Sequence, residues 1–201
     1  MSRGFNEHEK QVITNSLIEQ GRILFSKMGF QKTSIHEITQ NVGIAQGTFY
    51  KFFSSKEELY FAILEMEEEK IREQFVNLKV SNEDQPKKII KGILRKFINA
   101  IETNPLIREL YFGSNMEEML KRLSPELLEK HFAKDNDAIL ALIEKWRALG
   151  IQVKEDPAII AGVLRSLFVL TLHEKEIGEA VYHDTLELLI DLIVDGLIEE
   201  D

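Results

Sequence analysis

Apolar side chains recur along most of the chain at the three- and four-residue spacing that places them on one face of an α-helix. The first run carries Ile13, Leu17, Leu24 and Met28, and it stops at Gly29, a residue suited to the end of a helix. No stretch alternates apolar and polar residues as a half-buried strand does. The sequence therefore predicts an all-α protein with about nine helices.

Helix-start signals divide the rest of the chain. Ser34 with Glu37 and Ser55 with Glu58 have the spacing of capping boxes, and Pro125 and Pro157 each follow an N-cap residue, Ser or Asp. After the first helix, which ends near residue 28, we expect helices over about 34–41, 46–52, 55–79, 86–103, 106–112, 124–149, 157–175 and 182–198, with a further short piece near 116–122.

Composition fits a globular protein. Of 201 residues, 44% are hydrophobic and 29% are charged, and the absence of cysteine excludes disulfides and thiolate metal sites. The polar N-terminus has no secretory signal core. The longest apolar run, Ala158–Leu172, is short for a membrane span and contains Arg165, so we expect a buried core helix, no membrane partner and a cytoplasmic location.

The net charge of −9 is unevenly distributed. Residues 1–60 carry a net +1, and the remaining residues carry a net −10. An acidic protein can bind DNA through a face that is locally neutral or basic. The first 60 residues are therefore the candidate contact region.

Two short predicted helices meet at Gly43, which suits a tight turn, and this pattern indicates a helix-turn-helix. Seven apolar side chains are expected to pack inward: Phe25, Ile35, Ile38, Val42, Ile44, Phe49 and Phe53. Five residues then remain near the outer face, namely Gln46, Gly47, Thr48, Tyr50 and Lys51, and side chains of these types can contact base edges and phosphates. The alternative is an ordinary helical hairpin with a solvated polar face.

This segment resembles the DNA-binding region of TetR-family transcriptional regulators. The resemblance covers about 45 residues and rests on Phe25, Gly29-Phe30, Thr33-Ser34, Gly43, Gly47-Thr48-Phe49-Tyr50, Phe53, Ser55-Lys56-Glu57 and Leu59. It implies a DNA-binding domain over residues 1–53 and an effector-binding and dimerisation domain over 54–201. One departure is Ala45, where serine is common, so we expect the third helix to lack a side-chain cap.

The resemblance assigns roles position by position. Thr33 and Ser34 stand where the family contacts phosphate. Gln46, Gly47 and Thr48 stand where it meets bases. Tyr50 and Lys51 stand where phosphates or bases are touched, and Lys56 stands at the start of the fourth helix, where the helix dipole also favours phosphate.

The last two long helices are apolar on almost every side. Such helices need cover on two sides, and one domain core supplies only one. The resemblance likewise implies a homodimer formed through the last two helices, which would read a palindromic operator in double-stranded DNA. The alternative is a single large monomeric core.

The resemblance also implies an unidentified small-molecule effector bound among the middle helices. Side chains suited to lining that pocket, or to anchoring a polar group in it, are Phe97, Tyr111, Phe112, Met116, Met119, His131, Trp146, Arg165 and Phe168. The same residue types also build ordinary helical cores.

The chain lacks the sequence motifs of common hydrolases, P-loop proteins and dinucleotide-binding enzymes, and no cofactor, metal site or catalytic residue is predicted. The preferred hypothesis is a repressor released from its operator by a small molecule. Two alternatives stay open: a nucleoid-associated or architectural DNA-binding protein of the same fold, and a helical enzyme or adaptor.

Overall fold

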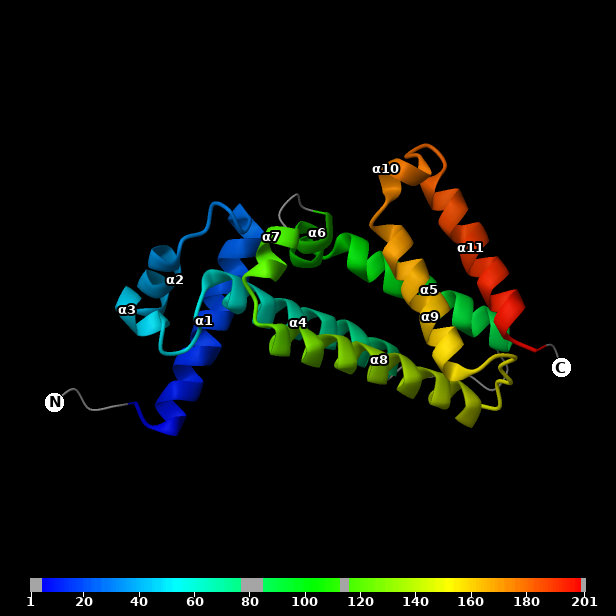
Figure 1. Cartoon of the computed structure of the whole chain (residues 1–201), viewed down its shortest axis with the longest axis horizontal. Helices are drawn as coiled ribbons and strands as arrows, with labels where there is room; N and C mark the ends of the chain where they lie inside the picture. Colours follow the sequence, from blue (N-terminus) through cyan, green and yellow to red (C-terminus); the bar gives the residue numbers. More distant parts are fainter. Residues whose placement is uncertain (1–4, 77–84, 113–115, 200–201) are drawn as a thin grey trace. The chain divides into compact units, whose positions relative to one another are not determined.

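The computed structural model describes residues 5–76, 85–112 and 116–199, with the side chains of 74–76, 110–112 and 116–118 left aside. These residues form eleven helices, so the all-α class is confirmed and the expected number of about nine was too low (Figure 1). Their bounds are α1 Glu7–Met28, α2 Ile35–Val42, α3 Gln46–Phe49, α4 Lys56–Val76, α5 Pro86–Thr103, α6 Pro105–Phe112, α7 Met116–Lys121, α8 Pro125–Ala148, α9 Pro157–Thr171, α10 Glu174–Ile177 and α11 Tyr182–Leu197. Within this part of the chain, the only β-type pairing is one isolated antiparallel bridge, Val153 with Ile198.

The predicted apolar helix ends earlier than expected. Its start is as predicted, because the Asp156 carboxylate accepts from the backbone N–H of Ala158 and Pro157 is the first helical residue. Its end lies at Thr171 rather than near Lys175, and His173 leaves the helical region with φ −120° and ψ 39°. A separate four-residue helix, α10, follows, which adds to the count.

The chain folds into two compact units. The first comprises residues 1–69 and 104–128, and the second comprises 70–103 and 129–201. Each unit is therefore assembled from two stretches that are distant in sequence. The predicted domain boundary after residue 53 stays a prediction, since close packing alone does not define where an independently folding domain ends.

The first unit encloses the predicted core of the helix-turn-helix. Four of the predicted core side chains, Phe25, Ile38, Phe49 and Phe53, are buried, and α4 adds Leu59 and several of its neighbours. Ile35, Val42 and Ile44 are half-buried. The predicted core is thus confirmed for the four buried side chains, whereas the other three are only partly buried.

The second unit is built around α11. One face of this helix is buried, with its apolar side chains in one cluster with Trp146 of α8 and Ile160 of α9. The hydroxyl of Tyr182, at the start of α11, donates to a Glu102 carboxylate oxygen and to the carbonyl of Thr171. No helix among the described residues is both long and apolar enough to cross a lipid bilayer.

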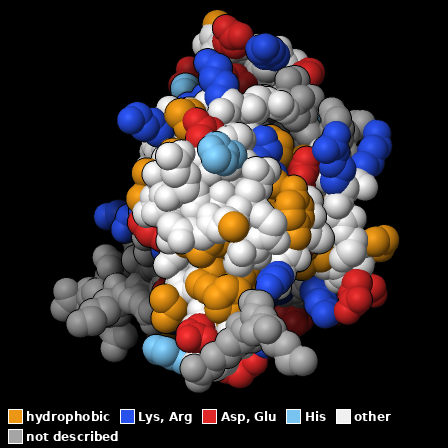
Figure 2. Space-filling view, turned by 90° about the vertical axis from the view of Figure 1, so that its left-hand side faces the viewer, with side chains coloured by type: hydrophobic (Ala, Val, Ile, Leu, Met, Phe, Trp, Pro, Cys, Tyr) orange, Lys and Arg blue, Asp and Glu red, His pale blue; other side chains and the backbone are white. Residues whose placement is uncertain are grey.

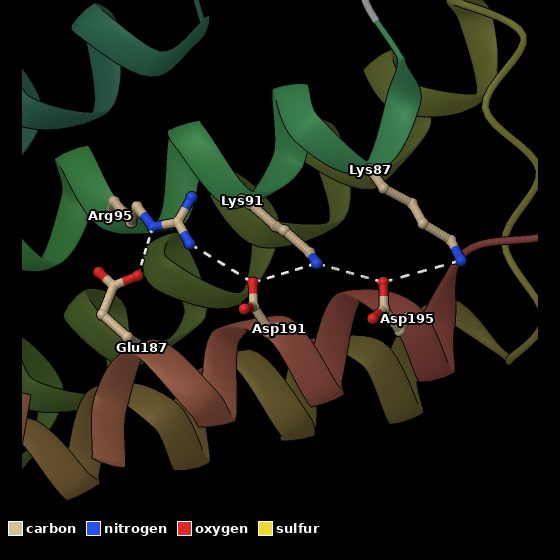
Figure 3. A network of polar contacts seen from close by, with 6 residues as sticks. All are labelled: Lys87, Lys91, Arg95, Glu187, Asp191 and Asp195. Atoms are coloured by element: carbon tan, nitrogen blue, oxygen red, sulfur yellow. Dashed lines mark hydrogen bonds and ion pairs between the residues drawn. The ribbon is translucent and has the colours of Figure 1, made fainter. Parts of the chain in front are cut away.

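A row of six charged side chains joins α5 to α11 (Figure 3). Lys91 lies at its centre, with Nζ 3.0 Å from Asp191 and 3.3 Å from Asp195. The remaining pairs join Lys87 to Asp195 and Arg95 to Glu187 and Asp191. All six follow a four-residue spacing on their own helix, so the two rows face each other. The hydrogen bond to Asp191 raises the pKa of Lys91 above its usual value.

We predict that Lys91→Met lowers the free energy of unfolding by about 1 kcal/mol, because it removes two partly exposed ion pairs. The difference should shrink at high salt, which screens such charges. Urea unfolding at low and high salt measures both effects. The matched control is Lys88→Met, which replaces an exposed lysine outside the row on the same helix. Equal losses for the two variants would contradict the assignment.

Candidate nucleic-acid interface

The turn between α2 and α3 depends on Gly43. This residue has φ 79° and ψ 30°, the left-handed conformation that side chains disfavour. The backbone N–H groups of Gly43 and Ile44 both donate to the carbonyl of Thr39, each at 3.0 Å. The turn thereby closes α2 and directs the chain into α3.

The start of α2 has the predicted capping box. The Ser34 hydroxyl oxygen accepts from the backbone N–H of Glu37 at 3.2 Å, and the Glu37 carboxylate accepts from the Ser34 N–H at 2.9 Å. The Ser34 hydroxyl also donates to that carboxylate, and this hydrogen bond lowers the pKa of Glu37. Ser34 is exposed at the helix N-terminus. Its contact with phosphate stays a prediction.

α3 and the two residues that follow it carry five of the eight predicted contact residues. Gln46, Gly47, Tyr50 and Lys51 are exposed and Thr48 is half-buried, while Phe49 faces the core. Figure 2 shows the face of the N-terminal unit that carries α2 and α3: its centre is mostly uncharged, and many of the lysine and arginine side chains lie toward its edges. The expected absence of a side-chain cap at Ala45 is confirmed. Such a face offers hydrogen bonds more than net charge.

Thr33 does not lie on that face. Its side chain is buried, and its hydroxyl donates to the carbonyl of Gly29 at 2.8 Å. In this conformation the hydroxyl holds the α1–α2 turn closed. Any phosphate contact at this position would therefore come from the backbone rather than the side chain.

Lys56 points into the protein more than was expected. Its Nζ donates to the carbonyls of Phe30 and Thr33 at 2.8 and 2.9 Å, and it lies 4.1 Å from the centroid of the Phe30 ring. Burial lowers the pKa of this ammonium below its usual value. Since an ammonium has three N–H bonds, two are used inside the unit. Lys56 therefore has a structural role within the unit. One N–H of its ammonium is left for the predicted contact with a phosphate.

The α4 N-terminus is likewise satisfied from within. The Ser55 hydroxyl accepts from the Glu58 backbone N–H, as the predicted capping box requires. The Glu58 carboxylate, however, accepts from the N–H of Ser54 rather than from that of Ser55. A carboxylate thus lies at the helix end where a phosphate was expected.

Sequence reasoning missed the role of Glu109. This α6 carboxylate accepts from the backbone N–H of Phe30 at 2.6 Å, across 79 residues of sequence. It lies beside Gly29, whose φ is 81°, and a Cβ at that glycine would be 2.8 Å from Glu109 Oε1. Nearby, the Tyr60 hydroxyl donates to the carbonyl of Leu106 at 2.7 Å, and burial raises the pKa of Tyr60. α6 is therefore fastened to the end of α1.

The residues predicted to line the effector pocket do not all belong to one unit. Met119 is buried in the first unit, whereas five candidates belong to the second: Phe97, His131, Trp146, Arg165 and Phe168. Of these, His131 and Trp146 are buried and Arg165 is exposed, with its guanidinium donating to Asn136. The side chains of Tyr111, Phe112 and Met116 lie outside the described residues. The pocket stays a prediction.

Comparison with known proteins settles the family. Residues 17–63 match the family model described as "Bacterial regulatory proteins, tetR family". This DNA-binding region belongs to the TetR family. The matched residues run from α1 into α4 and include the whole helix-turn-helix, which is the family's DNA-binding motif.

Relatives and solved structures agree with that placement. A TetR-family regulator from Pectobacterium atrosepticum has the same fold, with a TM-score of 0.75 at 19% identity, covering 98% of this chain and 99% of that one. An HTH-type transcriptional regulator encoded in the lacX 3' region of Lactococcus lactis is 26% identical over 73% of this chain and 77% of its own length. The nucleoid occlusion factor SlmA of Haemophilus ducreyi is 25% identical over 45% of each chain. The chain spans less than half the length of several curated relatives that it matches.

We predict that Lys56→Met lowers the free energy of unfolding by about 2 kcal/mol, because hydrogen bonds from a charged group to two carbonyls are lost. DNA affinity should fall in parallel, since the α1–α2 turn would loosen. Thermal unfolding and DNA titration of the same preparation measure the two effects. Lys32→Met, at an exposed lysine of the same unit outside the proposed contacts, is the control and should leave the unfolding midpoint unchanged. An unchanged midpoint for Lys56→Met would contradict its structural role.

Proposed function

We propose that this TetR-family regulator is a cytoplasmic repressor that binds a palindromic operator as a homodimer and is released by a small molecule. The observation that carries the proposal is the exposed α3 face, held on a buried core by the Gly43 turn. Phe49 alone is buried in this helix, while Gln46, Gly47, Tyr50 and Lys51 around it are exposed.

The proposed contacts divide by chemistry. Gln46 and Thr48 lie at the start of α3 and are assigned to base edges, because an amide can bond adenine and a threonine can meet a thymine methyl group. Tyr50 and Lys51 follow the helix and are assigned to phosphates. Gly47 lets the backbone approach the groove, and Ser34 adds a contact from the α2 N-terminus. Lys56 acts mainly by positioning.

The homodimer is supported by the outward side of α11. Leu188 and Leu192 are about 60% exposed on the side of α11 away from its buried residues. α9 adds Ile159 and Val169, also exposed. Leu188 and Leu192 lie one helical turn apart, and exposed apolar side chains that adjoin one another mark an interaction surface. A second copy of the same two helices would cover them.

Release by an effector is supported by the fastening of α6. The Glu109 carboxylate accepts a hydrogen bond from the Phe30 N–H. A displacement of α6 would therefore move the backbone at the end of α1. Coupling requires such an element with two arrangements, one of which the effector favours. The residues predicted to line the pocket are the candidates for that binding.

The likeness to a nucleoid occlusion factor favours one alternative, an architectural DNA-binding role with no effector. It would use the same α3 face. The two functions differ in the breadth of DNA sites and in the response to small molecules. Selection of bound duplexes from a random-sequence library separates them.

We predict that such a selection yields a palindrome whose half-sites are roughly 34–36 Å apart or a multiple of that distance. Gln46→Ala should then lose roughly 1–3 kcal/mol of discrimination at one base pair in each half-site. Tyr50→Ala should weaken binding to all the duplexes alike, because phosphate contacts carry no sequence information. Titrations against the selected duplex and its single-base variants measure both.

The control is Gln11→Ala, at an exposed glutamine on α1 outside the proposed face, which should bind like the unaltered protein. An asymmetric single half-site would contradict the dimeric operator. Broad, weakly specific recovery would favour the architectural role. If Gln46→Ala kept the ranking of the duplex variants, Gln46 would not be a base contact.

We predict that Leu188→Asp combined with Leu192→Asp converts the dimer to monomers and abolishes operator binding, because charges would be buried at the subunit contact. Light scattering after size-exclusion chromatography measures the mass. Val12→Asp is the matched control, since it adds a charge at an exposed apolar residue of α1. A double variant that stays dimeric would place the subunit contact elsewhere.

A further inference from the structure

Phe5 lies outside every assigned contact, yet it touches the proposed interface. Its ring packs against that of Phe52, with the centroids 5.9 Å apart and the planes at 47°. The Nζ of Lys51 lies 5.6 Å from the centroid of the Phe5 ring, a cation–π distance. Phe5 therefore contacts the two residues that follow Tyr50.

The position of Phe5 in the sequence predicts a different contact. It precedes Asn6, the N-cap of α1, and a hydrophobic residue at that position often packs on the fourth residue of its own helix where that residue is also hydrophobic. That residue is Lys10, which instead forms an ion pair with Glu7 at 2.7 Å. Phe5 is thus left to pack across the unit, against the segment after α3.

The consequence concerns the freedom of Lys51. A lysine side chain has many rotamers, and fixing it on a phosphate costs conformational entropy. The Phe5 ring beside the ammonium reduces the number of rotamers that the Lys51 side chain samples before DNA binds. Lys51 is exposed, so without the ring its ammonium would move more widely in solvent.

We propose that Phe5 is a positioning residue of the DNA interface, holding the Lys51 ammonium in place for contact with a phosphate. This rests on the proposed function, in which Lys51 contacts DNA. Phe5 itself touches no DNA in this role. It acts through the face of its ring.

The test is a double-mutant cycle on the operator duplex recovered by selection. Phe5→Leu keeps an apolar contact with Phe52 but removes the ring, whereas Phe5→Tyr keeps a ring. Each is made in the unaltered protein and in Lys51→Met, and the dissociation constant is measured across a salt series. Thermal unfolding of every variant accompanies the titrations.

Phe5→Leu should weaken binding by about two- to fivefold, the size of an exposed cation–π contact. It should also make the salt dependence shallower, and Phe5→Tyr should restore both. In Lys51→Met, the change to leucine should have no further effect on affinity.

Three results would overturn the positioning role. These are unchanged affinity in Phe5→Leu, an equal loss with and without Lys51, and wild-type affinity in Lys51→Met. A lowered unfolding midpoint with the same loss in both backgrounds would assign Phe5 to folding alone. None of these touches the groove contacts of α3. Absence of binding by the unaltered protein to any duplex would instead overturn the proposed function.

Discussion

The backbone of one residue, Phe30, is held from both sides by charged groups. Its N–H donates to the Glu109 carboxylate of α6, and its carbonyl accepts from the Lys56 ammonium of α4. Buried backbone groups must be paired, and bonds to charged partners are the strong ones. The turn between α1 and α2 is therefore defined by two later helices. The orientation of α2, and through Gly43 that of α3, depends on this arrangement.

The same reasoning explains why a lysine at the start of a helix need not serve DNA first. The helix dipole and the local N–H groups favour an anion at the α4 N-terminus, but the Glu58 carboxylate already lies there. The Lys56 ammonium lies over the Phe30 ring and donates to carbonyls of the α1–α2 turn that form no helical hydrogen bond. Carbonyls inside the protein thus compete with DNA phosphates for the lysine ammonium. A sequence motif gives the residue type at a position but not the group that its side chain binds.

Local features could be predicted from the sequence because their partners lie within one turn of helix. The capping box of Ser34 and Glu37, the N-cap at Asp156 and the missing cap at Ala45 are of this kind. The core of the helix-turn-helix followed from helical spacing. The hydrogen bond between Glu109 and Phe30 could not be predicted in this way, because 79 residues separate them. Neither a glutamate nor a phenylalanine at these positions indicates such a contact. The early end of α9 also escaped prediction, since no glycine or proline follows Thr171 before Gly178.

α11 shows how one helix can meet three different surroundings. Leu186 and Ile190 lie on its buried side, Asp191 belongs to the row that faces α5, and Leu188 and Leu192 remain exposed. In the sequence, these residues belong to one apolar helix with a few acidic residues. Only the folded structure shows which side of the helix is buried, which faces α5 and which is exposed.

The exposed side of α11 and the small size of α3 belong to one argument. α3 has four residues, and the face around it is largely uncharged, so a single copy offers few base contacts and few phosphate contacts. Phosphate contacts supply much of the affinity of DNA-binding proteins. A net charge of −9 adds no general attraction to DNA. Linking two copies makes the second binding event intramolecular, which raises affinity without any new contact. In the proposed dimer, the leucines on α11 thus provide what the α3 face lacks.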